Sequence, residues 1–117
     1  MDKHRDLIAW QRCRELVRAV YEATGDFPAS ERFGLTPQLR RAAVSAVANI
    51  AEGHTRYGRA EFAHALSMAL GSLAEVDTLL EVARDLSLLT SDAHRRVARL
   101  REEASRVTFA LQRSIRR

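Results

Sequence analysis

The stretch TPQLRRAAVSAVANIAEG, residues 36–53, indicates the fold of this 117-residue chain. Thr36 precedes a proline, which is the pattern of a hydroxyl N-cap with proline at the first helical position, and Gly53 is of the type found just past a helix end. From Ala42 onward the segment is apolar nearly all round the helix. An ordinary surface helix buries only one apolar stripe. We therefore expect a helix over residues 37–52 that is covered on more than one side.

A single small bundle covers only part of such a helix, so the sequence predicts an additional neighbour. The helix expected at residues 59–86 has the same property, because apolar residues lie beside its main seam as well as on it. The small side chains of the helix at residues 37–52 would let two backbones approach closely. We assign five apolar residues to an oligomer interface: Val44, Ala48, Ala51, Leu79 and Val82.

Composition and length describe one soluble globular domain over residues 1–117. Apolar residues make up 46% and charged residues 29% of the chain, and a chain of this length buries roughly two-thirds of the surface that its unfolded form exposes. No run reaches the ~20 apolar residues of a membrane span, and the start, MDKHRDLIAW, places charges where a signal peptide has its apolar core. We therefore expect a cytoplasmic protein. The single cysteine, Cys13, agrees with a reducing compartment because it has no partner for an internal disulfide.

Hydrophobic periodicity predicts four helices, at residues 5–24, 37–52, 59–86 and 91–116. In the third, apolar residues from Phe62 to Ala83 alternate four- and three-residue steps, which is the seam of antiparallel or coiled-coil-like packing. One short helical turn is expected at residues 30–33, and Ser91 is the expected N-cap of the fourth helix. No stretch alternates with a period of two for long enough to suggest a sheet. The predicted fold class is all-α, an antiparallel up-down-up-down four-helix bundle.

Basic residues gather in the last helix. Eighteen of the 19 basic side chains are arginine; residues 91–117 hold eight basic and three acidic side chains, whereas residues 1–90 hold 11 basic and 12 acidic ones. Such an asymmetry attracts a polyanion, although a merely solvated face is the alternative for so small a net charge. The predicted nucleic-acid-binding residues are Arg95, Arg96, Arg99, Arg106, Arg113, Arg116 and Arg117.

The residue types of a catalytic centre do not occur at the required spacing. Glu61 and His64 have the Glu-x-x-His spacing of di-iron bundles, but such a site needs a second pair and two further carboxylates. The glycines lack the spacing of a phosphate-binding loop. Cys13 lies on the apolar face of the first helix and is expected to be a small buried residue. We therefore expect a non-enzymatic protein without catalytic, cofactor-binding or metal-binding residues, and keep a site in the connection at residues 54–57, HTRY, as an alternative.

Four polar residues have an expected structural role. Arg41, Asn49 and Glu52 lie on one stripe of the second helix, and Glu75 lies on the third. An arginine and a glutamate brought together in a partly buried place can form a bidentate pair, which fixes helix register more than it adds stability. We prefer this interpretation over a catalytic one.

Several short motifs resemble the signature of a known family. They are Leu39-Arg40-Arg41, Asn49-Ile50-Ala51-Glu52-Gly53, Arg56, Glu61-Phe62 and Gly71-Ser72-Leu73-Ala74-Glu75, preceded by Trp10, Phe27-Pro28 and Phe33-Gly34-Leu35-Thr36. Over about residues 7–90 the chain is similar to the bacterial four-helix-bundle proteins encoded by intervening sequences within large-subunit ribosomal RNA genes. One departure is Gly58, where the family usually has a serine that would cap the third helix.

This resemblance implies a homopentamer arranged as a ring. It also implies a more distant similarity to the accessory protein of diversity-generating retroelements, a basic pentamer that works with a reverse transcriptase and nucleic acid. The leading hypothesis is a non-enzymatic oligomeric protein whose arginines contact RNA or DNA backbone. The alternative is a scaffold that docks a partner enzyme such as a reverse transcriptase, with Phe109 and the exposed side of the third helix as its docking surface.

Overall fold

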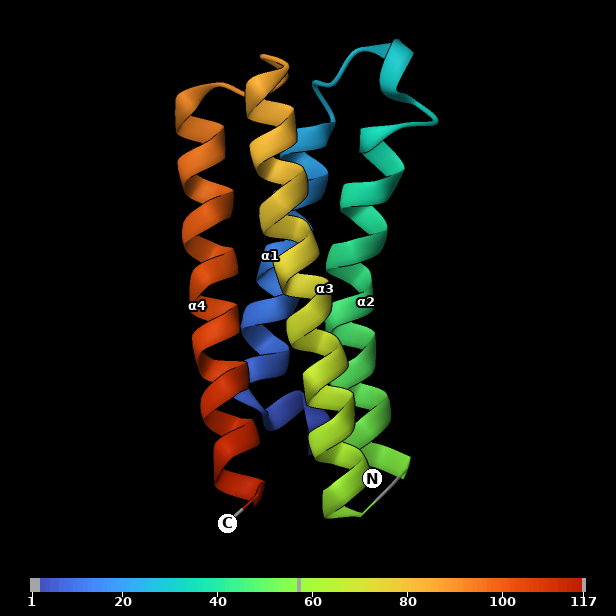
Figure 1. Ribbon diagram of the computed structural model, residues 1–117, viewed down its shortest axis with the longest axis vertical. Helices are drawn as coiled ribbons and strands as arrows, with labels where there is room; N and C mark the ends of the chain where they lie inside the picture. The colour runs from blue at the N-terminus through green and yellow to red at the C-terminus, as the bar shows by residue number, and fades with distance from the viewer. Residues whose placement is uncertain (1–2, 57, 117) are drawn as a thin grey trace.

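Four α-helices account for most of the computed structural model, which describes residues 3–56 and 58–116. The helices are α1 (Ile8–Thr24), α2 (Leu35–Arg56), α3 (Arg59–Asp85) and α4 (Ser91–Arg116), with short 3-10 helices η1 (Lys3–Asp6) and η2 (Ala29–Glu31). They lie side by side in an elongated body of 43 × 22 × 19 Å (Figure 1). The described ranges contain no strand, so the all-α prediction is confirmed.

The core lies between the four helices, each of which contributes an apolar stripe. Leu16 of α1, Ile50 of α2, Leu73 of α3 and Val97 of α4 are among its fully buried side chains. The seven positions of the predicted seam in α3 are all buried: Phe62, Leu66, Ala69, Leu73, Val76, Leu80 and Ala83. Steps of four and three residues keep these positions on one face of a helix, which is why they pack together. The connection from α1 to α2 and that from α3 to α4 lie at the upper end of Figure 1, and the C-terminus lies at the lower end.

The beginning of α2 differs from the prediction. The helix starts at Leu35, so Thr36 lies inside its first turn and is not its N-cap. Instead, the carboxylate of Glu31 accepts the Leu35 N–H at 2.9 Å. Pro37 is tolerated because the first N–H groups of a helix have no intrahelical partner. A side chain from the preceding turn therefore caps this helix.

The prediction that Gly53 ends α2 is wrong. The helix continues through Gly53 to Arg56, so the expected connection at residues 53–59 is shorter than predicted. Gly53 is buried against α3, and a β-carbon at this position would lie 2.4 Å from Cβ of Ala65. The glycine is required for close approach of the two helices, and its freedom of backbone conformation is not used here.

The remaining helix ends also differ in detail. α1 begins at Ile8 instead of residue 5, because residues 3–6 form the separate turn η1. The N–H of Ala93 donates to Oγ1 of Thr90 at 3.1 Å, so Thr90, and not the expected Ser91, caps α4. After α3, Ser87 has a φ of 59°. The Leu88 N–H returns to the carbonyl of Ala83 at 2.9 Å, which satisfies a carbonyl left open at the helix end.

Candidate nucleic-acid interface

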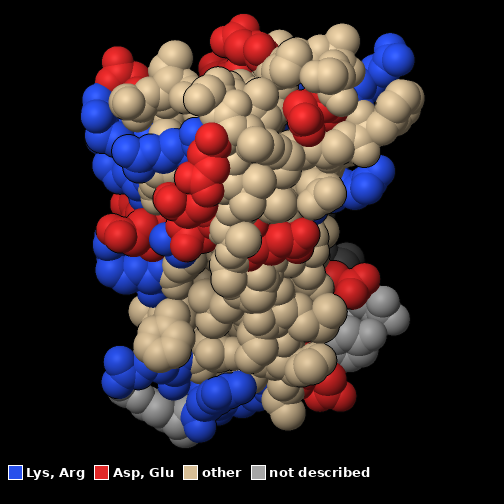
Figure 2. Space-filling model, turned by 45° about the horizontal axis from the view of Figure 1, so that its top comes forward, with Lys and Arg blue, Asp and Glu red and all other residues tan. Residues whose placement is uncertain are grey.

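The described arginines predicted to bind nucleic acid all lie on the surface of α4. Arg95, Arg96, Arg99, Arg106, Arg113 and Arg116 are exposed, whereas Arg117 lies outside the described residues. α4 turns Val97 and Ala104 toward the core, so the arginines at other positions of the helical repeat face outward. Figure 2 shows basic side chains along the left edge of the molecule and at its lower end, and a broad area without charged side chains in the middle.

Two arginines in the first half of α4 are neutralised by acidic side chains. Arg95 forms an ion pair with Asp92, one turn earlier in the same helix. The Nη1 atom of Arg96 lies 2.9 Å from Oε1 of Glu22, which belongs to α1. Both pairs are exposed, so they lower the local positive charge more than they stabilise the fold.

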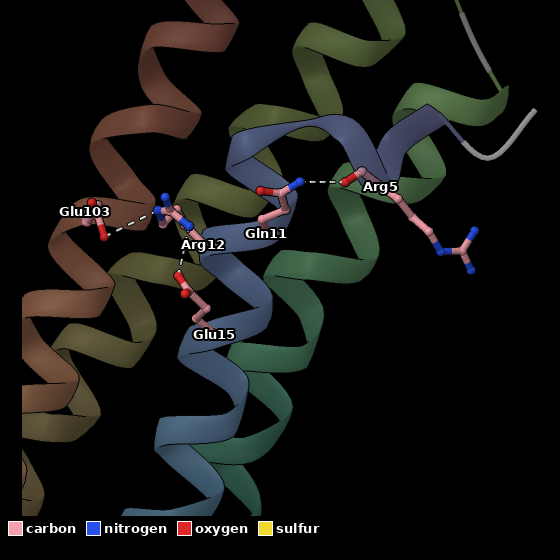
Figure 3. A network of polar contacts seen from close by, with 5 residues as sticks. All are labelled: Arg5, Gln11, Arg12, Glu15 and Glu103. Carbon is pink, nitrogen blue, oxygen red and sulfur yellow. Dashed lines mark hydrogen bonds and ion pairs between the residues drawn. The ribbon is translucent and has the colours of Figure 1, made fainter.

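Two further arginines connect α4 to its neighbours. Arg101 is half-buried, and its Nη2 atom lies 3.8 Å from Oδ1 of Asp77 on α3. Arg12 of α1 lies between two carboxylates, with Nη1 3.1 Å from Glu15 of the same helix and Nε 3.6 Å from Glu103 of α4 (Figure 3). These guanidinium groups are oriented by their carboxylates and are poorly placed for an external anion.

The second half of α4 retains its positive charge. Residues 104–116 include Arg106, Arg113 and Arg116 and no acidic residue. Within residues 3–56 and 58–116, none of these three arginines makes an ion pair. The guanidinium of Arg113 lies 5.9 Å from the centre of the Phe109 ring. The unneutralised charge of α4 is therefore concentrated toward its C-terminal end.

A hollow of about 430 Å³ extends this basic region onto α3. It lies where α3 begins and α4 ends, and it is lined by Arg59, His64, Ile115 and Arg116 together with two alanines and no carboxylate. Nε of Arg59 donates to the carbonyl of Ile115 at 3.2 Å, which holds the two helix ends together. Sequence reasoning missed Arg59 and His64, because they join the arginines of α4 only when both helix ends meet at one end of the bundle.

Helix α1 also brings arginines toward α4, which the sequence analysis did not predict. Arg18 lines a depression of about 280 Å³ together with Arg96, Arg99 and two glutamates. The two glutamates offset most of the charge of this groove, so it is a weaker anion site than the C-terminal half of α4.

The five predicted interface residues differ in exposure. Val44 and Val82 remain 40% and 39% exposed, and Ala48 is also exposed. Ala51 and Leu79 are half-buried, and Leu79 packs against the protomer's own core. Part of the predicted interface is therefore apolar surface that the single chain leaves uncovered.

Ser45 accepts hydrogen bonds from polar residues of α2 and α3, whereas the charged residues Arg41 and Glu75 do not pair with each other. Nδ2 of Asn49 donates to the carbonyl of Ser45 at 2.8 Å, and the Ser72 hydroxyl of α3 donates to Oγ of Ser45 at 3.0 Å. Arg41 and Glu75 are exposed, as is Glu52. In the described part of the chain Arg41 and Glu75 have no ionic partner, so one protomer alone does not form the expected arginine–glutamate pair.

The residues that could carry other chemistry are not assembled into a site. Cys13 is completely buried, and this burial raises the pKa of its thiol to about 11, an effect that the nearby Thr108 hydroxyl only partly opposes. His64 is exposed, and no three His, Cys, Asp or Glu side chains of the described ranges could hold a metal ion together. Residues 54–56 of the alternative site are helical, whereas Tyr57 lies outside the described residues. Among the described helices, none has the length and apolar character to cross a membrane.

Comparisons with known proteins agree with this architecture. Residues 5–110 match the family model of the 23S rRNA-intervening sequence protein. A crystal structure of a protein of unknown function from the S23 ribosomal protein family of Bacteroides thetaiotaomicron has a similar fold, with a TM-score of 0.80 and 19% sequence identity. The alignment covers 90% of this chain and 98% of that one. None of the curated proteins matches the chain.

Proposed function

The chain belongs to the 23S rRNA-intervening sequence protein family, and on this premise we propose that it is a non-enzymatic, oligomeric nucleic-acid-binding or accessory protein. It contacts the RNA or DNA backbone through those arginines of α4 that make no ion pair within the described residues, Arg106, Arg113 and Arg116 among them. The family name refers to ribosomal RNA, which makes 23S rRNA fragments the first probe to use. The proposal places the protein in the cytoplasm and assigns it no catalytic, cofactor or metal site.

The observation that carries this proposal is the C-terminal half of α4, where Arg106, Arg113 and Arg116 are exposed and make no ion pair within residues 3–56 and 58–116. Guanidinium groups on one exposed helix can contact phosphates without reading base edges. Each contact releases condensed counterions, so binding of this kind weakens steeply as salt rises. Arg59 and His64 add donors at the same end of the bundle.

Assembly is the second part of the proposal. We propose that each protomer is an antiparallel up-down-up-down bundle and that five protomers close into a ring. Exposed Val82 of α3 and Ala48 of α2 support a subunit contact, because they are apolar surface that a single chain leaves uncovered. A contact between different patches of identical subunits generates a ring when the rotation closes. Five chains of net charge +4 together carry about +20, which strengthens attraction for a polyanion.

A salt titration tests nucleic-acid binding. RNA and duplex DNA are titrated with the protein at several salt concentrations, and the triple variant Arg106→Gln, Arg113→Gln, Arg116→Gln is compared with the wild-type chain. We expect the slope of log K against log salt to fall by about 2–3 in the variant, since each lost phosphate contact contributes about 0.7–0.9. Arg95→Gln is the matched control, because Asp92 already neutralises that arginine. Absence of binding at low salt, or binding that salt does not weaken, contradicts the proposal.

Mass measurement in solution tests the assembly. Five chains of 13.2 kDa give a particle of about 66 kDa. Val82→Asp should dissociate the ring while each chain keeps its helicity, because the side chain is 39% exposed in the single chain and would place a charge in the apolar subunit contact. A wild-type protein that runs as a 13.2 kDa monomer overturns this part of the proposal.

A protein-docking scaffold is the second candidate function. Phe109 of α4 is 51% exposed and Met68 of α3 is 50% exposed, and these two helices pack against each other. Figure 2 shows that one face of the molecule has a broad area without charged side chains. Large exposed apolar side chains that gather on one face are typical of a protein contact. Association with one protein, such as a reverse transcriptase, that survives nuclease treatment and high salt but is lost in Phe109→Asp would favour this function over nucleic-acid binding.

A further inference from the structure

A hollow of about 640 Å³ opens between α1 and α2 at the end of the bundle opposite to the C-terminus. Its walls are the last turn of α1, the connection that contains η2 and the first half of α2, all near the upper end of Figure 1. This volume is within the range of about 300–1,000 Å³ that small-molecule sites occupy. The arginines of α4 do not line it, so it is separate from the interface described above.

The hollow combines an apolar wall with three arginines. Phe27, Pro37 and Val44 provide apolar surface, and Arg32, Arg40 and Arg41 provide positive charge. No carboxylate lines it. The nearby carboxylate of Glu31 already accepts the N–H of Leu35 at 2.9 Å, so it caps α2. A hollow with this lining favours a ligand that has both a flat apolar body and a negative charge.

Arg40, which lines this hollow, is held by two contacts with α1. Its guanidinium carbon lies 4.4 Å from the centre of the Tyr21 ring, and its Nε donates to Oγ1 of Thr24 at 2.9 Å. The Thr24 hydroxyl in turn donates to the carbonyl of Val20 at 2.8 Å. The contact with the ring and the hydrogen bond through Nε together restrain the guanidinium group. Aromatic rings and guanidinium planes are the surfaces on which proteins stack unpaired bases.

The other two arginines remain available for an anion. Arg32 and Arg41 are exposed, and in the described part of the chain neither makes an ion pair. Arg32 lies with its guanidinium carbon 4.9 Å from the centre of the Phe33 ring. Guanidinium groups bind phosphate through two parallel N–H bonds. The hollow therefore presents a stacking surface beside two guanidinium donors.

We propose that this hollow binds one nucleoside monophosphate unit. The base packs against the Tyr21–Arg40 stack and the apolar wall, and Arg32 and Arg41 contact the phosphate. This goes beyond the proposed function, because the arginines of α4 contact the backbone of any nucleic acid whereas the hollow admits only a nucleotide that is not base-paired. The unit can be a free mononucleotide or an unpaired nucleotide within a single strand.

Calorimetric titration of the full-length protein with AMP, GMP, CMP and UMP tests the proposal, with adenosine and inorganic phosphate as separate probes. We expect saturable binding of at least one mononucleotide, and binding at least about tenfold weaker for adenosine and for phosphate, since each lacks one of the two contacts. Arg41→Gln and Tyr21→Leu should each weaken nucleotide binding by about tenfold. Both residues are exposed, so the variants should keep the wild-type helicity by circular dichroism.

A second arm identifies the source of the nucleotide. Short single-stranded oligonucleotides and duplexes of the same sequence are compared in the wild-type chain, in Arg41→Gln and in the control Arg113→Gln. If the unit belongs to a strand, Arg41→Gln weakens single-strand binding and leaves duplex binding unchanged. If it is a free nucleotide, only mononucleotide binding changes. Both results support the site.

Three outcomes overturn the inference. The first is that no mononucleotide or single strand binds saturably. The second is that adenosine binds as tightly as AMP. The third is that Arg41→Gln changes the particle mass but leaves nucleotide binding unchanged. The last result assigns the hollow to a second copy of the chain. Duplex binding by α4 is measured on the same protein, so failure of the hollow and failure of the proposed function are separate results.

Discussion

Arg96 of α4 and Glu22 of α1, 74 residues apart in the sequence, form an ion pair with 2.9 Å between Nη1 and Oε1. Both side chains are more than half exposed, so the pair contributes about 0–1 kcal/mol to folding. Its larger effect is to neutralise one arginine beside the proposed nucleic-acid interface. The charge of that interface is therefore set partly by α1.

Removing the carboxylate of Glu22 should strengthen nucleic-acid binding. In Glu22→Gln, Arg96 is free to contact a phosphate, so we expect the slope of log K against log salt to steepen by about 0.7–0.9. The free energy of unfolding should change by less than about 1 kcal/mol. Asp26→Asn makes the same change in net charge in the connection after α1. An equal gain in both variants would show that total charge, and not Arg96, controls binding.

The cap of α2 gives a second prediction. Because Glu31 accepts the Leu35 N–H, Glu31→Ala should destabilise the protein by about 1 kcal/mol in thermal or urea unfolding. Thr36→Ala should have a much smaller effect, because Thr36 is not the N-cap. The reverse order of these two effects would contradict the assignment of the cap.

Substitution of alanine for two helical glycines should change the stability of the protein in opposite directions. A β-carbon at Gly53 would lie 2.4 Å from Cβ of Ala65, so Gly53→Ala should destabilise the protein by about 1–3 kcal/mol. At Gly71 a β-carbon meets no atom within 4 Å, so Gly71→Ala should stabilise the protomer by about 0.5–1 kcal/mol through helix propensity. Urea unfolding of both variants measures the difference. Loss of assembly in Gly71→Ala would place Gly71 in a subunit contact.

Cys13 should make the protein sensitive to alkali. Burial raises the pKa of its thiol from 9.0 to about 11, so the folded state holds the proton to higher pH than the unfolded state. The free energy of unfolding is therefore unaffected by ionisation of this thiol below pH 9. It falls progressively between about pH 9 and pH 11, by roughly 2–3 kcal/mol. Urea unfolding across this range measures the loss.

Cys13→Ala is the matched control for this pH dependence. It should lose less stability between pH 9 and pH 11, because the variant has no buried thiol to deprotonate. In the wild-type chain at pH 8, iodoacetamide should modify Cys13 only after unfolding. Rapid modification of the folded protein would contradict complete burial of the thiol.

Periodicity was sufficient to predict the helices and the residues of the α3 seam. These features depend on local spacing, and all seven seam positions are buried. The helix ends were harder to predict, because Thr36 and Gly53 fit two roles. Thr36 is a residue type that caps helices, but the helix already begins at Leu35, whose N–H donates to the carboxylate of Glu31. Gly53 is a residue type that ends helices, but Ala65 of α3 requires a glycine there.

The amino-acid sequence alone predicted the arginine-rich surface of α4, since the spacing of the apolar residues in this helix defines which helix face points outward. It did not predict which arginines keep their charge. Glu22 reaches Arg96 only because α1 packs against α4, and Arg59 joins Arg116 only because the start of α3 meets the end of α4. Helix formation follows from neighbours three or four residues away, whereas an ion pair or a hollow depends on groups brought within a few ångströms by packing of distant segments. Local periodicity therefore specifies the elements, and their packing specifies the electrostatics and the binding surfaces.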